Sequence, residues 1–240
     1  MNLRGFRLAS RALALESGER RSNSAGAGGE FLEFRSYQPG DDVRRVDWNV
    51  YARSGKLFTR RFEAERASRT YALLDTSASM DDKRDQATTT LGLLRNLAHA
   101  DRWLERSVPN MPGALSRLAQ ERPGLVLVIS DGLEPLAHWR DGLAFLRSRN
   151  FDVSFVQVLS KDDLAPPSGA WRVQDAEGTG NLEVDDRTRQ AYLLRLEAHL
   201  EGLSALVRGF GFRIVRLEVG LSPAEVWARL RRAGVLERGT

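Results

Sequence analysis

The sequence predicts an α/β fold with a mostly parallel β-sheet and helices on both faces. Short apolar segments that read as buried strands recur along the second half of the chain, at 70–75, 125–130, 153–159 and 212–219. Amphipathic helical patterns lie between and after them, at 87–104, 114–120, 136–146 and 189–209. Alternation of strands with helices is typical of parallel sheets. A capping pattern, Ser222-Pro-Ala-Glu225, predicts the start of one more helix.

The first third of the chain has a different pattern. Residues 3–20 show a weak helical periodicity, and the Gly/Ser-rich stretch 22–29 is typical of a linker. Short pieces with alternating apolar and polar residues then predict strands at 30–35 and 56–62. We therefore expect an N-terminal helix at 1–21, a small β-rich segment at 22–66 and the α/β domain at 67–240; within the last, 160–188 is polar and turn-rich.

Composition excludes some classes of protein and weighs against others. The chain has no cysteine, so disulfides and thiolate metal sites are excluded. Its net charge of +4 comes from 36 basic and 32 acidic residues mixed along the chain, which favours a solvated surface over a nucleic-acid interface. The sequence shows neither a signal-peptide pattern nor an apolar run of about 18 residues that could span a membrane. We therefore expect a cytoplasmic protein.

Polar oxygen donors follow two of the predicted strands. Asp75 ends the first strand, Ser77 and Ser79 follow it in the same loop, and Asp131 follows the strand at 125–130. The carboxyl ends of parallel strands meet at one edge of a sheet, and Mg²⁺ prefers oxygen ligands. These four residues therefore predict a Mg²⁺ site whose ion could accept an acidic residue of a partner protein. The alternative is that Ser77 and Ser79 cap the next helix while Asp75 binds backbone amides.

Enzymatic readings find less support. A metal-dependent phosphoester hydrolase using Asp75 and Asp131 is one alternative, but a haloacid dehalogenase-type phosphatase needs an acid where Ser77 stands. The chain has neither a Gly-x-Ser-x-Gly turn nor a phosphate-binding Gly-x-x-x-x-Gly-Lys loop. Its histidines, His99, His138 and His199, fall in predicted helices away from the strand ends. We expect no enzyme activity; a basic nucleic-acid-binding protein is the third possibility.

Two groups of motifs resemble known families. Asp75-Thr-Ser-Ala-Ser-Met80 with Ser130-Asp131-Gly132 resembles the metal-ion-dependent adhesion site of von Willebrand factor A domains. A longer resemblance, over roughly 15–237, is to the bacterial family catalogued as domain of unknown function 58; it is carried by the runs at 29–48, 51–53, 61–63 and 171–177 and by the C-terminal part. Within it, charged residues at 41–47 predict either a solvated cluster with Trp48 packed beneath it or a surface ion-pair network that docks this segment or a partner.

The resemblance implies a von Willebrand factor A-like fold and a non-enzymatic role beside a MoxR-type AAA+ ATPase, in chaperone-like assembly or maturation of other proteins. Relatives insert two more strands, and a loop with a metal-ligating threonine, between the first helix and the Ser-Asp-Gly motif. Here only 56 positions separate Asp75 from Asp131. We therefore expect a narrowed sheet and a weak or degenerate Mg²⁺ site. The first strand would lie near an exposed edge, covered by the segment 30–62 or by a second copy in a homodimer.

Overall fold

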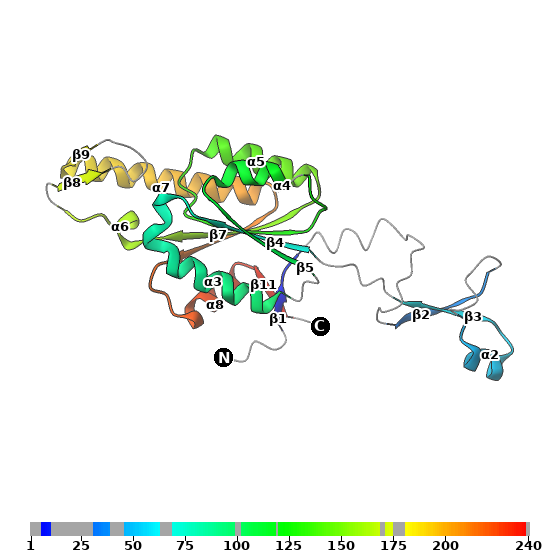
Figure 1. Cartoon of the computed structure of the whole chain (residues 1–240). Coiled ribbons are helices and arrows are strands. Elements are labelled where there is room, and N and C mark those ends of the chain that lie inside the picture. Colours follow the sequence, from blue (N-terminus) through cyan, green and yellow to red (C-terminus); the bar gives the residue numbers. More distant parts are fainter. Residues whose placement is uncertain are drawn as a thin grey trace. The chain divides into compact units, whose positions relative to one another are not determined.

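The chain forms two compact units, made of residues 17–67 and of residues 1–16 with 68–240. The computed structural model describes residues 6–10, 31–38, 46–62, 69–98, 102–118, 120–168, 171–174 and 181–238 (Figure 1). Most of the helix predicted at 3–20 lies outside these residues, but Phe6–Leu8 is wrongly predicted, because it forms strand β1. β1 pairs antiparallel with β11 (Leu236–Arg238), and its alternation of half-buried, exposed and buried side chains suits a strand.

A five-stranded, wholly parallel sheet organises the larger unit and confirms the predicted α/β class. The strand order is β10-β7-β6-β4-β5. The bounds are Arg69–Asp75 for β4, Arg102–Val108 for β5, Leu125–Ser130 for β6, Asp152–Leu159 for β7 and Arg213–Glu218 for β10. Every residue of β6 and β7 is buried, as expected for central strands with both faces covered.

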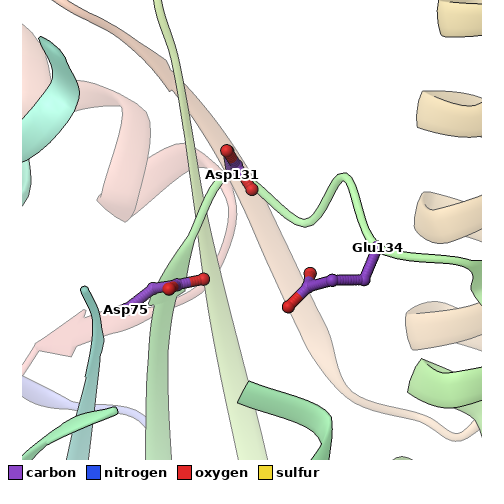
Figure 2. A group of neighbouring side chains, drawn as sticks. All are labelled: Asp75, Asp131 and Glu134. Carbon is purple, nitrogen blue, oxygen red and sulfur yellow. The ribbon is translucent and has the colours of Figure 1, made fainter. Parts of the chain in front are cut away.

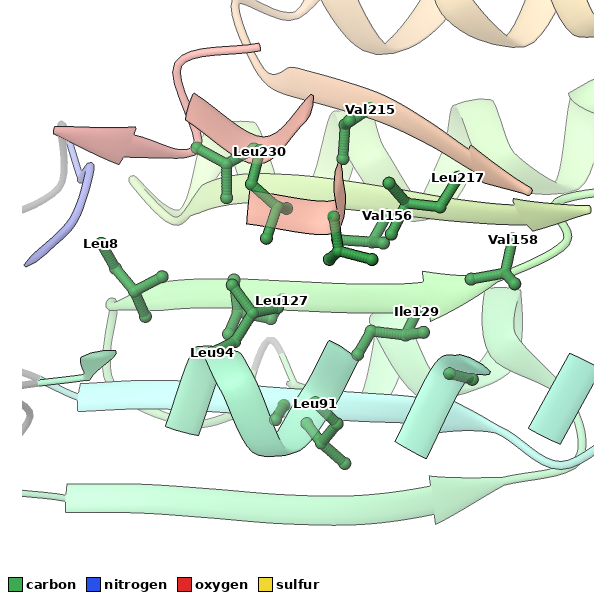
Figure 3. Packing of buried hydrophobic residues seen from close by; sticks show 14 of the residues in the cluster. Leu8, Leu91, Leu94, Leu127, Ile129, Val156, Val158, Val215, Leu217 and Leu230 are labelled. Carbon is green, nitrogen blue, oxygen red and sulfur yellow. The ribbon is translucent and has the colours of Figure 1, made fainter. Parts of the chain in front are cut away.

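Helices cover both faces of the sheet, as in a von Willebrand factor A-like or Rossmann-like domain (Figure 1). One face carries α3 (Arg84–Leu97) and α8 (Pro223–Arg232); the other carries α4 (Met111–Leu118), α5 (Leu136–Ser148) and α7 (Asp186–Gly209). Figure 3 shows Leu91 and Leu94 of α3 beside Leu127 and Ile129 of β6. The predicted capping box at Ser222 is confirmed. Among the described helices, none has the length and apolar character needed to cross a membrane.

The connection between α3 and β6 differs from the prediction. α3 ends at Leu97, and the chain then forms β5, which pairs in parallel with β4 over its full length. Residues 102–104 are therefore strand rather than helix, and the expectation that another segment or a second copy covers β4 is wrong. The side chains of residues 104–107 are exposed. An edge strand with few buried residues lacks the apolar periodicity from which buried strands are recognised.

Short elements complete both units. A 3₁₀-helix, η2 (Ala78–Lys83), precedes α3, and the turn-rich region predicted at 160–188 contains α6 (Lys161–Leu164), β8 (Trp171–Gln174) and β9 (Asn181–Val184). The smaller unit contains the two predicted strands, β2 (Phe31–Ser36) and β3 (Phe58–Phe62), which pair antiparallel, and adds α2 (Trp48–Ser54). Asp47 caps α2, and Trp48 is 59% exposed, which contradicts the interpretation that Trp48 packs beneath a charged cluster. The charged residues at 41–45 lie outside the described residues.

Candidate metal centre at the carboxyl edge of the sheet

Asp75 is the last residue of β4, and its carboxylate is held by both flanking segments. The side chain is nearly buried, with 3% exposure. Oδ1 accepts a hydrogen bond from the Ser77 amide at 2.9 Å, and Oδ2 accepts one from the Ser130 hydroxyl at 2.6 Å. Because Ser130 ends the neighbouring strand β6, this second bond ties the two strand ends together across the sheet.

Asp131 follows β6 directly and is equally buried, with 2% exposure. Its Oδ1 accepts a hydrogen bond from the Leu133 amide at 3.2 Å, and its carbonyl oxygen accepts one from Gln157 Nε2 at 2.8 Å. The next residue, Gly132, has a φ of 69°, and its amide donates to the Ser130 hydroxyl at 3.0 Å. The Ser-Asp-Gly run thus forms a tight turn that directs the Asp131 carboxylate back over the strand ends.

The structure brings the two aspartates together and adds a third carboxylate. Asp75, Asp131 and Glu134 each offer an oxygen, and these three oxygens lie within 4.8 Å of one another. Figure 2 shows the three carboxyl groups turned toward a common space. The predicted convergence of Asp75 and Asp131 is confirmed, whereas their role as metal ligands stays a prediction. The sequence analysis did not identify Glu134. Its position three residues after Asp131, in the same loop, could have indicated that it belongs to the site.

The two serines of the motif face each other, with their hydroxyl oxygens 3.1 Å apart. Adjacent oxygen ligands of an octahedral Mg²⁺ lie roughly 3 Å apart, so this spacing suits a hard cation. Ser77 stands at the N-cap of η2 but makes no side-chain capping bond, which speaks against the capping interpretation for this residue. Asp75 does accept a backbone amide bond, as that interpretation expected. The donor set therefore fits a hard divalent ion held by oxygens alone.

A buried lysine shares this cluster and was not foreseen. The Lys83 side chain at the end of η2 is 2% exposed, and its ammonium contacts Asp131 Oδ2 at 3.2 Å and Asp163 Oδ2 at 3.1 Å. It also donates to the Ser79 carbonyl oxygen at 2.6 Å. Burial alone lowers the pKa of the ammonium, but the carboxylates of Asp131 and Asp163 outweigh it and raise the pKa above its ordinary value. The Lys83 ammonium is therefore charged at neutral pH, and each of its protons has an oxygen acceptor within reach.

The expectation that the histidines lie away from the strand ends is wrong for His199. This residue of α7 places its Nε2 2.8 Å from the carbonyl oxygen of Gly132. Since a carbonyl oxygen can only accept, Nε2 carries the proton and donates. His199 thus holds the turn that carries Asp131, and helical periodicity could not reveal this because it says nothing about which loop a helix crosses.

Replacing Gly132 should loosen this turn. A Cβ at this position would meet Leu203 Cδ2 at 2.6 Å, and a φ of 69° is unfavourable for any residue with a side chain. We expect Gly132→Ala to lower the free energy of unfolding by about 1–2 kcal/mol, since the end of the Leu203 side chain can shift. Urea unfolding measures this. Gly220→Ala is the control, because Gly220 has a φ of 94° but open space where a Cβ would lie. If Gly220→Ala lost as much stability as Gly132→Ala, the destabilisation at Gly132 would come from its φ alone and not from contact with Leu203.

Comparison with known proteins decides the family. The model of the family described as protein of unknown function DUF58 matches residues 33–91 and 83–201, more than half of the chain. The chain belongs to the DUF58 family. Uncharacterized proteins of Mycobacterium bovis and of two strains of Mycobacterium tuberculosis are 30% identical to this DUF58 chain, over 80% of it and 75% of their own length.

A solved structure also resembles this DUF58 chain. It is that of the conserved hypothetical protein BatB from Bacteroides thetaiotaomicron, with 11% identity and a TM-score of 0.39. The match covers 67% of this chain and 94% of the BatB chain. The match of the family model confirms the resemblance to the DUF58 family noted from the sequence.

Proposed function

We propose that this DUF58 chain is a non-enzymatic protein-interaction module that docks a partner at the carboxyl edge of its parallel sheet. The observation that carries the proposal is the convergence of the buried carboxylates of Asp75 and Asp131 with Glu134. Ligands of parallel sheets characteristically bind outside the carboxyl ends of the strands. A cluster of carboxylates held in place by hydrogen bonds at this position favours recognition of a charged group.

A weakly held Mg²⁺ would assist this docking. Asp75, Asp131, Ser77 and Ser79 are the residues that would hold it, with Glu134 close enough to contribute. When bound, the ion supplies a positive centre that an acidic residue of a partner can approach. The carboxylate oxygens of Asp75 already accept bonds from Ser77 and Ser130, and Asp131 Oδ2 contacts Lys83. Such prior engagement lowers the affinity for an ion, in keeping with a weak site.

The arrangement around these carboxylates supports docking more than hydrolysis. A hydrolytic mechanism needs a base or nucleophile aligned on a substrate. In the described part of the chain, His199 is the histidine that contacts the turn carrying Asp131. Its Nε2 donates a hydrogen bond to the Gly132 carbonyl oxygen. Lys83 is enclosed by Asp131, Asp163 and the Ser79 carbonyl. These contacts position the loop and leave neither group directed at a reacting atom.

The partner that we propose is a MoxR-type AAA+ ATPase, and the shared role is chaperone-like assembly or maturation of other proteins. This partner is the one that the resemblance to the DUF58 family implies, and the family model matches residues 33–91 and 83–201 of the chain. A homodimer formed by strand pairing would use one of the edge strands, β5 or β10, rather than β4, since β4 already has a neighbour on each side.

Binding of a purified MoxR-type ATPase tests the proposed function. We expect Asp75→Ala to weaken binding at least about tenfold, equivalent to about 1.4 kcal/mol, and chelation by EDTA to weaken the wild-type complex in the same direction. Biolayer interferometry with the immobilised DUF58 chain measures both effects. Asp141→Ala, which removes an exposed carboxylate on α5, is the matched control and should leave binding unchanged.

Two results would contradict the proposal. Equal affinity of wild type and Asp75→Ala for the ATPase would remove the carboxyl edge from the interface. Mg²⁺-dependent turnover of p-nitrophenyl phosphate that disappears in Asp75→Ala would instead establish a phosphoester hydrolase using Asp75 and Asp131.

A further inference from the structure

Lys83 connects three elements around the candidate metal centre. Its ammonium lies 2.6 Å from the Ser79 carbonyl oxygen of η2, 3.2 Å from Asp131 Oδ2 after β6 and 3.1 Å from Asp163 Oδ2 of α6. Asp163 Oδ2 also accepts the Ser160 amide at 2.8 Å, within the capping box that starts α6. The Asp163 carbonyl oxygen accepts a bond from the Tyr192 hydroxyl of α7 at 3.0 Å. The lysine therefore joins the Asp131 turn to α6, and α6 is joined to α7.

The site carries more negative than positive charge. Four carboxylates meet here, those of Asp75, Asp131 and Glu134 together with Asp163, and Lys83 is the cation that contacts two of them. Carboxylates gathered in a buried cluster repel one another strongly unless a cation compensates them. A buried lysine is also unfavourable unless it is paired and fully hydrogen-bonded, which Lys83 is. The lysine and the carboxylates thus stabilise each other without any bound ion.

We propose that the Lys83 ammonium is a built-in cation of the candidate metal centre, which keeps the carboxyl edge formed without a divalent ion and competes with such an ion for Asp131. The inference rests on the metal-assisted docking proposed above, because it describes how that same site is kept ready and why its affinity for an ion is low. Since the ammonium is tethered to the chain, it occupies its place at any ion concentration. The docking edge therefore keeps its shape when divalent ions are scarce.

The test replaces Lys83 by methionine, which keeps the length of the side chain and removes its charge. In EDTA, we expect the melting temperature of Lys83→Met to lie at least about 5 °C below that of wild type. Calorimetric titration should show that Mn²⁺ and Mg²⁺ bind the variant at least about tenfold more tightly than wild type, because a like charge has been removed from the site. Saturating Mg²⁺ should recover most of the lost melting temperature in the variant.

Lys161→Met is the matched control, because Lys161 is an exposed lysine on α6. It should leave both the melting temperature and the ion affinity unchanged. A Lys83→Met protein with the wild-type melting temperature in EDTA, or with an ion affinity no higher than that of wild type, would overturn the inference. These readouts use the DUF58 chain alone, so a failure of the proposed function would show separately, as binding of the ATPase that does not depend on Asp75.

A second variant covers the case in which Lys83→Met does not fold. Asp163→Asn keeps a side-chain oxygen that can accept the Ser160 amide, but it removes the charge that faces Lys83. We expect hydrogen exchange at residues 161–165 to accelerate at least about tenfold, with little change in β6, because the lysine no longer holds α6. Unchanged exchange at 161–165 would overturn the role of Lys83 as the link between Asp131 and α6.

Discussion

Replacing Asp131 by alanine should lower the free energy of unfolding by about 3 kcal/mol, because it leaves the buried ammonium of Lys83 without one of its two close carboxylates. The variant also loses the acceptor for the Leu133 amide. For a chain of 240 residues, a loss of this size lowers the melting temperature by roughly 10 °C. Differential scanning calorimetry and urea unfolding both measure it.

Two control variants separate the charge from the rest of the side chain. Asp131→Asn keeps an oxygen for the Leu133 amide and should lose less stability than Asp131→Ala, with the remaining loss due to the missing charge. Asp82 also approaches Lys83, at 3.7 Å, but its side chain is 55% exposed. Asp82→Ala should therefore change the stability by less than about 1 kcal/mol. If the Asp131 and Asp82 variants were equally stable, Lys83 would not depend on Asp131.

Replacing Gly124 by alanine should be comparably destabilising, at about 3 kcal/mol. The residue is buried just before β6, and a Cβ there would lie 2.5 Å from the Arg69 carbonyl oxygen and 3.2 Å from Tyr71 Cε2. The Gly124 carbonyl also accepts the Asp152 amide at the start of β7. Because the residue is held between two strands, the clash with backbone can be relieved only by moving a strand.

Gly92 offers the matched control for this prediction. It lies on the exposed side of α3, and a Cβ there would meet nothing within 4 Å. Gly92→Ala should therefore raise the free energy of unfolding by about 0.5–1 kcal/mol, since alanine favours the helix over glycine. Urea unfolding of both variants checks the pair, and a Gly124→Ala protein as stable as Gly92→Ala would show that the strands at this position can part easily.

Much of the fold follows from the pattern of apolar residues. The strands β4, β6 and β7 are buried over most of their length, so their apolar runs identify them almost to the residue. β10 is identified by the buried apolar residues Ile214, Val215 and Leu217 among half-buried polar ones. The Ser222 capping box identifies the start of α8 in the same way. β5 escaped prediction because Glu105, Arg106 and Ser107 are exposed on an edge strand, and local composition cannot show that such a segment pairs with β4.

Only some residues of the candidate site could be predicted from the sequence. Asp75 and Asp131 were predictable, because Asp75 ends a buried strand, Asp131 directly follows another, and parallel topology places both at one edge. Glu134 lies in the same loop as Asp131, so loop neighbours of a predicted ligand deserve inclusion in such predictions. Lys83 and His199 could not be found from periodicity, because their contacts with Asp131 and Gly132 depend on how η2 and α7 cross the end of the sheet.

The most direct test of the docking surface is hydrogen exchange of this DUF58 chain, free and bound to a MoxR-type ATPase, followed by mass spectrometry. Complex formation should slow exchange at residues 76–80, which follow Asp75 and carry Ser77 and Ser79, and at residues 131–135, which carry Asp131 and Glu134. The interior of β6 and β7 should exchange slowly in both states. Slowed exchange confined to α2 (Trp48–Ser54), with these two loops unchanged, would place the interface elsewhere and contradict docking at the carboxyl edge.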